Sequence, residues 1–166
     1  MARLSHLTMP TAEQAFRPFK ELVETFDMAF PMMLWATRDA VQPVQVMPPE
    51  DWPQEASLTD LYTYAANGLL EQLGQPIWVV VSAEAFMMDV DSWEEVETYR
   101  HGDAEKRREA GDTSVKDAVT ITGVSLTQDY SYQIPFERQK HRVRWGQPKQ
   151  SAAYGAIADL LKQLVR

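Results

Sequence analysis

Residues 77–88 read IWVVVSAEAFMM, and this stretch decides the fold class. Every residue except Glu84 is apolar or small, which is the composition of a strand buried on both faces of a sheet. Because alternate residues of a strand point to the same face, Glu84 shares a face with Trp78, Val80 and Phe86. We therefore expect the central strand of a sheet here, and the carboxyl group of Glu84 needs an explanation.

Helical and extended patterns flank this strand. The predicted order is a helix at 11–26, two strands within 31–46, a helix at 57–74, the central strand, strands at 117–129 and 130–145, and a helix at 151–165. This pattern predicts one α+β domain over residues 1–166, with a mainly antiparallel sheet of about five strands and three main helices packed mostly on one face.

Local signals predict where the elements begin and bend. Thr11 and Gln14 match a capping box, although Pro18 raises the alternative that the well-formed helix begins at the proline. Pro43 confines its strand to an edge or a bulge, because proline donates no hydrogen bond to a neighbouring strand. The apolar positions change parity across Gly123, which predicts a β-bulge at this glycine.

Composition limits the classes of function. The chain has 166 residues, no cysteine and a net charge of −8. The length suits one domain with a full core, and the missing thiols exclude disulfides and cysteine-based metal sites. The negative charge disfavours non-specific binding to nucleic acid or anionic membranes. No apolar run is long enough to cross a bilayer, so we expect a soluble, cytoplasmic protein.

Charges of opposite sign are segregated along the chain. A polar, charge-rich segment at about 89–115 is expected to be an exposed insert that opens with acids, whereas cations crowd the last predicted strand. Opposite clusters attract each other within one chain, between two copies or across an interface with a protein partner. The expected partner-binding residues are Asp89, Asp91, Glu94, Glu95, Arg138, Lys140, Arg142 and Arg144.

Catalytic motifs are missing from the sequence, which has no Gly-rich phosphate loop, nucleophile elbow or paired histidines. Glu84 and His141 remain as weak catalytic candidates, because a carboxyl group in apolar surroundings can act as a general acid or base. The alternatives are that Glu84 pairs with an arginine of a neighbouring strand or lies at the rim of the sheet, and that His141 is a surface residue. The acids at 89–97 lack the central glycine of a calcium loop, so we expect no metal or cofactor.

Aromatic residues share the parity of the cations in the last predicted strand. Tyr130, Tyr132 and Phe136 precede the cations on one face, an arrangement that a platform for single-stranded nucleic acid would use. Against this, Pro135 is expected to break the strand, and the rings are as well suited to the core. Nucleic-acid binding through residues 130–144 is therefore kept as an alternative.

The step Glu84-Ala85-Phe86, the charge-rich excursion after it and the later segment AVTITGVSL form a pattern over about residues 75–127. This pattern resembles small uncharacterised proteins encoded by bacteriophages and prophages. The resemblance implies a phage context, in the host cytoplasm or the virion, and it implies no catalytic residue.

These observations favour a non-enzymatic protein-interaction domain, such as a phage accessory or virion-associated protein that acts through contacts with a protein partner or with copies of itself. The first alternative is a small hydrolase-like enzyme that uses Glu84 with His141 or with an arginine of a strand. The second is the single-stranded nucleic-acid binder described above.

Overall fold

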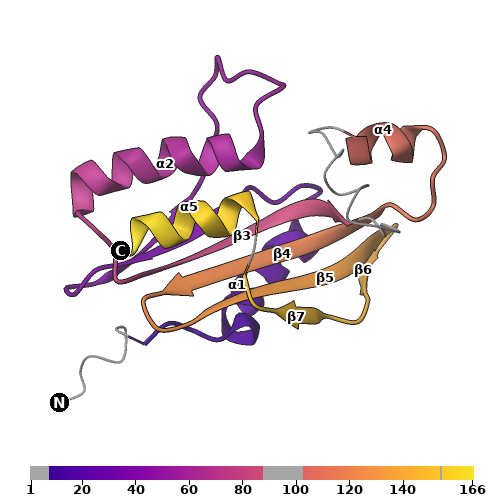
Figure 1. Ribbon diagram of the computed structural model, residues 1–166. Helices are drawn as coiled ribbons and strands as arrows, with labels where there is room; N and C mark the ends of the chain where they lie inside the picture. Colours follow the sequence, from indigo (N-terminus) through magenta and orange to yellow (C-terminus); the bar gives the residue numbers. More distant parts are fainter. Residues whose placement is uncertain (1–7, 88–102, 154) are drawn as a thin grey trace.

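Residues 8–87, 103–153 and 155–166 are described by the computed structural model, which shows a curled antiparallel sheet with helices on both faces (Figure 1). The helices are α1 (Ala12–Thr25), α2 (Leu58–Leu73), α4 (Asp103–Glu109) and α5 (Ala156–Leu164). The strands are β1 (Met32–Ala36), β2 (Val41–Gln45), β3 (Trp78–Met87), β4 (Lys116–Ser125), β5 (Asp129–Gln139), β6 (Arg142–Trp145) and β7 (Lys149–Ser151).

The sheet confirms the predicted α+β class and has more strands than expected. Its order is β2-β1-β3-β4-β5-β6, and every neighbouring pair is antiparallel. The short strand β7 pairs with β5 beside β6, which makes seven strands in the described part of the chain. β3, which contains most of the opening stretch, is central, as its apolar composition predicts.

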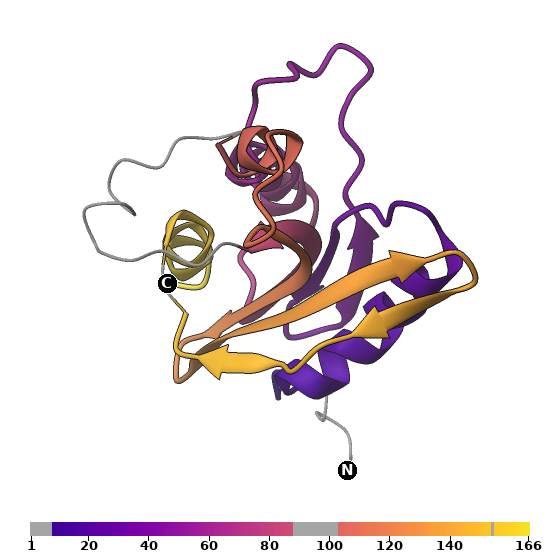
Figure 2. The same cartoon turned by 90° about the vertical axis from the view of Figure 1, so that its right-hand side faces the viewer.

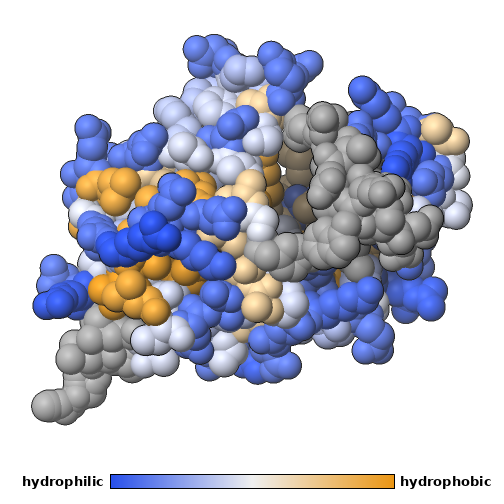
Figure 3. Space-filling view, in the orientation of Figure 1, coloured by the Kyte–Doolittle hydropathy of each residue, from blue (hydrophilic) through white to orange (hydrophobic). Residues whose placement is uncertain are grey.

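Both faces of β3 are covered, and its alternation assigns each residue to a face. Val79 and Val81 pack in one core beneath α2 and α5, while Trp78 and Val80 pack in a second core beneath α1. Figure 2 shows α5 and α1 on opposite sides of the sheet. Two of the three main helices thus share a face. The side that carries α2 and α5 is largely hydrophilic at its surface, with separate apolar areas (Figure 3).

Helix α1 begins at its capping box and contains the proline. The hydroxyl of Thr11 accepts a hydrogen bond from the backbone N–H of Gln14 at 3.2 Å, and the side-chain oxygen of Gln14 accepts from the N–H of Thr11 at 3.0 Å. The alternative start at Pro18 is therefore wrong. Pro18 lies on the exposed face of the helix, where water can hydrate the carbonyl that a proline leaves without a donor.

The β-bulge expected at Gly123 is absent, because β4 pairs in unbroken register with β3 on one side and with β5 on the other. The change of parity arises because both faces are covered: Ile121 packs beneath α1 and Val124 in the core of α2 and α5. The ring of Tyr130 fills the space over Gly123. A Cβ atom added at Gly123 would lie 2.6 Å from the Cζ atom of this ring. The Tyr130 hydroxyl donates a 2.8 Å hydrogen bond to the carbonyl of Pro10.

The segment 130–145 is a hairpin, and the prediction of one long strand was wrong. β5 and β6 pair from Phe136 opposite Trp145 to Gln139 opposite Arg142. Pro135 does not break β5, because it faces the gap between β6 and β7 at the outer edge. There its carbonyl accepts a hydrogen bond from the N–H of Gly146 at 2.8 Å, so the missing N–H of the proline deprives no strand of a donor.

Candidate functional site

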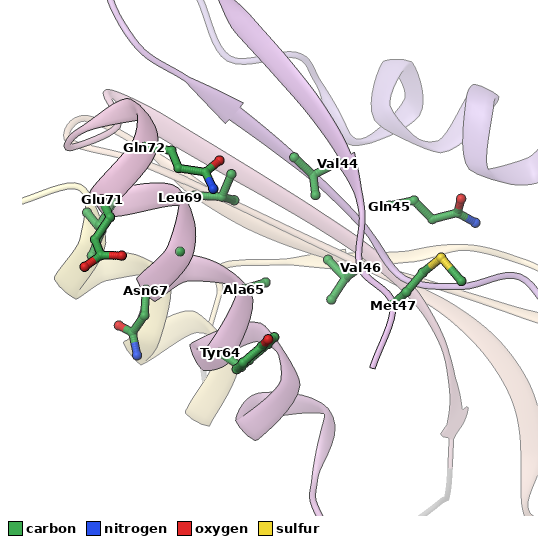
Figure 4. Close-up of a pocket in the computed structure, with 12 residues that line it drawn as sticks. Val44, Gln45, Val46, Met47, Tyr64, Ala65, Asn67, Leu69, Glu71 and Gln72 are labelled. Atoms are coloured by element: carbon green, nitrogen blue, oxygen red, sulfur yellow. The ribbon is translucent and has the colours of Figure 1, made fainter. Parts of the chain in front are cut away.

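An open groove of about 740 Å³ runs between the edge strand β2 and helix α2 (Figure 4). Val44 and Val46 come from the strand side, and Ala65 and Leu69 come from the helix. All four also belong to or pack against the core beneath α2, so the floor of the groove is the rim of that core, where Val46 and Leu69 are buried and Val44 and Ala65 are partly buried. This volume lies within the usual range for ligand pockets.

The outer edge of β2 supplies backbone groups that no described strand pairs with, and one of them, the carbonyl of Pro43, accepts a 3.5 Å hydrogen bond from the side chain of Gln42. Val46 donates its N–H to the carbonyl of Pro31 at 2.7 Å, which sets the phase of the β1–β2 ladder. Since hydrogen-bonded pairs alternate in an antiparallel ladder, the N–H and C=O groups of Val41 and Gln45 and the C=O of Pro43 point away from β1. Among the described strands, none pairs with this side of β2.

Gly68 lies in the interior of α2 and lines the groove. A glycine inside a helix costs about 1 kcal/mol of stability relative to alanine. Neither tight packing nor backbone conformation requires it, because a Cβ atom built at Gly68 has no other atom within 4 Å and its φ is not positive. The space that a side chain would occupy is part of the open groove.

The ends of the groove differ in chemistry. Tyr64 and Met47, whose side chains are 54% and 59% exposed, lie toward one end, and the ring of Trp52 packs against Tyr64 at 5.4 Å between centroids. Figure 4 shows Gln72 on the side of Val44 and Tyr64 on the side of Val46. Glu71 is the charged residue of the described lining, which contains no cation. The groove is therefore apolar along its floor, and its one charged lining residue is near the C-terminal end of α2, with its side chain on the side of the helix away from β2 (Figure 4).

Glu84 forms an ion pair with Arg138. The sequence left open an arginine of a neighbouring strand, but Arg138 is in β5, which β4 separates from β3. The carboxylate of Glu84 also accepts a 3.3 Å hydrogen bond from the N–H of Ala29. The guanidinium of Arg138 donates to the carbonyls of Val23 and Phe26 at 3.3 and 3.0 Å, at the end of α1. A cation is favourable there, because the last carbonyls of a helix lack partners. The pair joins β3, β5 and α1.

The two weak catalytic candidates do not share a hollow. Glu84 lines a hollow of about 270 Å³ with apolar neighbours that include Met28, Phe30 and Phe86, and His141 is not part of that lining. His141 is exposed in the turn between β5 and β6. Glu84 and His141 are therefore not brought together, whereas Glu84 and a strand arginine, the other pair of the enzyme alternative, are in contact as Glu84 and Arg138.

The predicted cationic stripe is divided between the faces of the sheet. Arg138 is on the face of α1 and is engaged by Glu84. In β6, Val143 and Trp145 pack against the core beneath α1, so the side chains of Arg142 and Arg144 project to the opposite face. Three exposed residues of this hairpin, here called the hairpin cations, are Lys140, Arg142 and Arg144. The predicted acidic residues Asp89, Asp91, Glu94 and Glu95 lie outside the described residues.

The described part of the insert is tied to the sheet by Arg108 of α4. Its guanidinium pairs with the carboxylate of Asp117 in β4 through two hydrogen bonds, and it lies 5.5 Å from the centroid of the Phe86 ring. The hydrogen bond to Asp117 raises the pKa of Arg108. This contact anchors α4 beside the end of β3.

The aromatic residues of β5 belong to the core. Tyr130, Tyr132 and Phe136 are only 8%, 7% and 6% exposed, so their rings are not available for stacking on nucleotide bases. Burial raises the pKa values of Tyr130 and of Tyr62, whose hydroxyl donates to the carbonyl of Ser82 at 3.2 Å.

The described residues offer neither a membrane-spanning helix nor a cluster of metal ligands. In that part of the chain, no helix has both the length and the apolar character needed to traverse a lipid bilayer. Nor do the described His, Asp and Glu side chains form a group of three able to hold a metal ion.

Sequence reasoning missed the groove. The signal that could have indicated it is Gly68, an interior glycine in an otherwise strongly helical segment.

Comparison of the chain with protein families, with curated proteins and with solved structures finds no significant match. The resemblance to phage proteins therefore stays a prediction.

Proposed function

We propose that this chain is a non-enzymatic protein-interaction domain that binds a segment of a partner protein in the groove between β2 and α2. The observation that carries the proposal is an apolar groove of about 740 Å³ that runs along an unpaired strand edge. Side-chain pockets and backbone groups beside each other are what a bound peptide needs for specificity and affinity. A phage or virion context for the partner is the expectation from the resemblance alone.

The chemistry of the groove favours binding over catalysis. Its described lining contains no serine, threonine, histidine or lysine, and Glu71 is its one ionisable carboxyl group. A general acid or base needs a second group to act with, and a nucleophile needs a base. Elsewhere, the carboxylate of Glu84 is already engaged by Arg138 and by the N–H of Ala29.

The proposal is tested with a surface-displayed library of random linear peptides, each about ten residues long, which is enough to span a strand of the length of β2. Peptides selected on the wild-type chain are measured against Gly68→Leu and against the matched control Thr63→Leu. Both positions are in α2, but Thr63 is exposed and does not line the groove. Both variants are expected to fold, because neither side chain enters the core.

We expect Gly68→Leu to weaken peptide binding by about tenfold or more, since the new side chain fills the groove, and Thr63→Leu to leave binding within about twofold. Equal binding to all three proteins would show that the peptides bind elsewhere and would refute the groove as the site. Failure to select any peptide would refute the proposal as well.

A further inference from the structure

We infer that the segment in the groove is an extended strand that pairs antiparallel with β2 and directs a large apolar side chain at Gly68. The inference rests on the proposed function and names the conformation and chemistry of the partner. It follows from the direction in which the backbone N–H and C=O groups of β2 point, from the open space over Gly68 and from the charge of Glu71.

The backbone of β2 offers an antiparallel strand a defined set of hydrogen bonds. Residues opposite Val41 and Gln45 each exchange two hydrogen bonds with the outward groups, and the residue opposite Pro43 donates one to its carbonyl. Only the donor that proline lacks is missing from this ladder. All strand pairs of the sheet are antiparallel, so the added strand continues the existing pattern.

The pleat decides which partner side chains enter the groove. Val44 faces α2, because it packs against the core beneath that helix. A partner residue opposite Val44 places its side chain on the same face, toward Ala65, Gly68 and Leu69. The open space at Gly68 leaves room for a large apolar group there, such as leucine, isoleucine or phenylalanine. We call this partner residue the anchor.

The negative charge near one end of the groove predicts at which end the partner segment carries a cation. Glu71 follows Gly68 by one turn of α2, toward the end of the groove that Gln72 and Val44 share (Figure 4). An antiparallel partner reaches this end with the residues that follow its anchor. Figure 4 shows the side chain of Glu71 on the side of α2 away from β2, so only a long lysine or arginine that reaches over the helix approaches its carboxylate. The net charge of −8 on the whole chain also favours a cationic partner. The expected segment is therefore extended, apolar at the anchor and basic after it.

Scanning the selected peptides tests the conformation. In a peptide that pairs antiparallel with β2, the residues whose backbones hydrogen-bond to β2 point their side chains away from α2. The anchor and every second residue from it point their side chains into the groove. We expect alanine substitution to weaken binding at every second position of the peptide, and backbone N-methylation to weaken it at the positions between. The most sensitive positions should lose about tenfold in affinity. Sensitivities that fall on the same residues would overturn antiparallel pairing. Alanine sensitivity with a spacing of three and four residues would replace the strand with a helix.

Variants of the chain supply an independent readout. Gln45→Pro removes an outward N–H without touching the bonds to β1, and Gln45→Ala is its matched control. We expect the first to weaken peptide binding by about tenfold and the second to change it less than about threefold. In hydrogen exchange, the bound peptide should protect the amides of Val41 and Gln45, while those of Gln42 and Val44, already bonded to β1, change little.

The outcomes separate the inference from the proposed function. If Gly68→Leu blocks the peptides but the scans and Gln45→Pro show no strand pattern, the groove binds a partner in another conformation and only the inference fails. If Gly68→Leu has no effect, the proposed function fails first. Protection of Val41 and Gln45 without peptide, rising with protein concentration, would assign the edge to a second copy of the chain and overturn the partner segment.

Discussion

Replacement of Gly68 by alanine should make the folded chain more stable. Alanine exceeds glycine in helix propensity by about 1 kcal/mol in a helix interior. The structure offers no opposing cost, because the new Cβ atom has no other atom within 4 Å and the backbone at this position is helical. For a chain of this size, a gain of about 1 kcal/mol raises the midpoint of thermal unfolding by about 3 °C.

Gly74 provides the matched control for this prediction. A Cβ atom at Gly74 also has no atom within 4 Å, but Gly74 ends α2 with a φ of 83°. With its ψ of −175°, this backbone is in a region that is essentially confined to glycine and costs another residue about 1 to 3 kcal/mol, so Gly74→Ala should lower the free energy of unfolding although its Cβ atom meets no obstacle. The pair separates the effect of backbone conformation from that of available space.

Urea unfolding followed by circular dichroism measures both variants, with thermal melting as a second probe. A Gly68→Ala protein less stable than the wild type would refute the argument, because it would show that the chain itself needs the space over Gly68. A gain in stability would mean that the wild-type chain keeps a destabilising glycine, as expected where function requires room at the surface of the helix.

The remaining predictions concern the ion pair, the packing of β4 and the hairpin cations. Glu84→Leu should lower the free energy of unfolding by about 1 to 2 kcal/mol, because Arg138 keeps its carbonyl partners but loses its charged one, whereas Glu84→Gln should cost less than about 1 kcal/mol in urea unfolding. Gly123→Ala should cost about 1 to 3 kcal/mol, since its Cβ atom would lie 2.6 Å from the Tyr130 ring, and Tyr130→Leu in the same chain should recover part of the loss. Changing all three hairpin cations to serine should leave the melting temperature nearly unchanged and alter self-association or partner binding in a salt-dependent way, measured by sedimentation at low and high salt.

A specific measurement would contradict each of these three predictions. A large loss for Glu84→Gln alone would mean that the negative charge, and not the hydrogen-bond acceptor, holds the end of α1. A tolerated Gly123→Ala would show that the Tyr130 ring can move away from the space over Gly123. Sedimentation of the serine variant identical to that of the wild type at every salt concentration would remove the hairpin cations from the expected partner-binding residues.

The sequence predicts much of the fold, because local rules agree with the tertiary structure. The apolar run at 77–88 is typical of a covered sheet, and the helix cap at Thr11 and Gln14 forms as these residues indicate. The hairpin was missed because its turn, Lys140-His141, lacks the Asn-Gly or Asp-Gly signal of a two-residue loop. The bulge at Gly123 was a wrong inference from parity, since a sheet covered on both faces allows apolar residues of either parity.

The candidate site is less accessible to sequence reasoning, because its parts meet only in three dimensions. An arginine partner for Glu84 was one of the alternatives, but its identity as Arg138 depends on how β5 passes the end of α1. The groove likewise requires both the edge position of β2 and the placement of α2 over it. Pro43 indicated the first of these, and no local pattern indicated the second.

The two edges of the sheet differ in a way that favours a role for β2. The edge formed by β6 and β7 carries Arg142, Arg144 and Lys149 and is interrupted at Pro148, features that discourage pairing with other chains. The residues of β2 carry no charge, and Pro43 removes only one of its outward donors. An uncharged edge beside an apolar groove invites pairing, so its retention is a liability unless a partner uses it. Under the proposed function, the proline would limit indiscriminate pairing, and the groove at Gly68 would select the segment that is accepted.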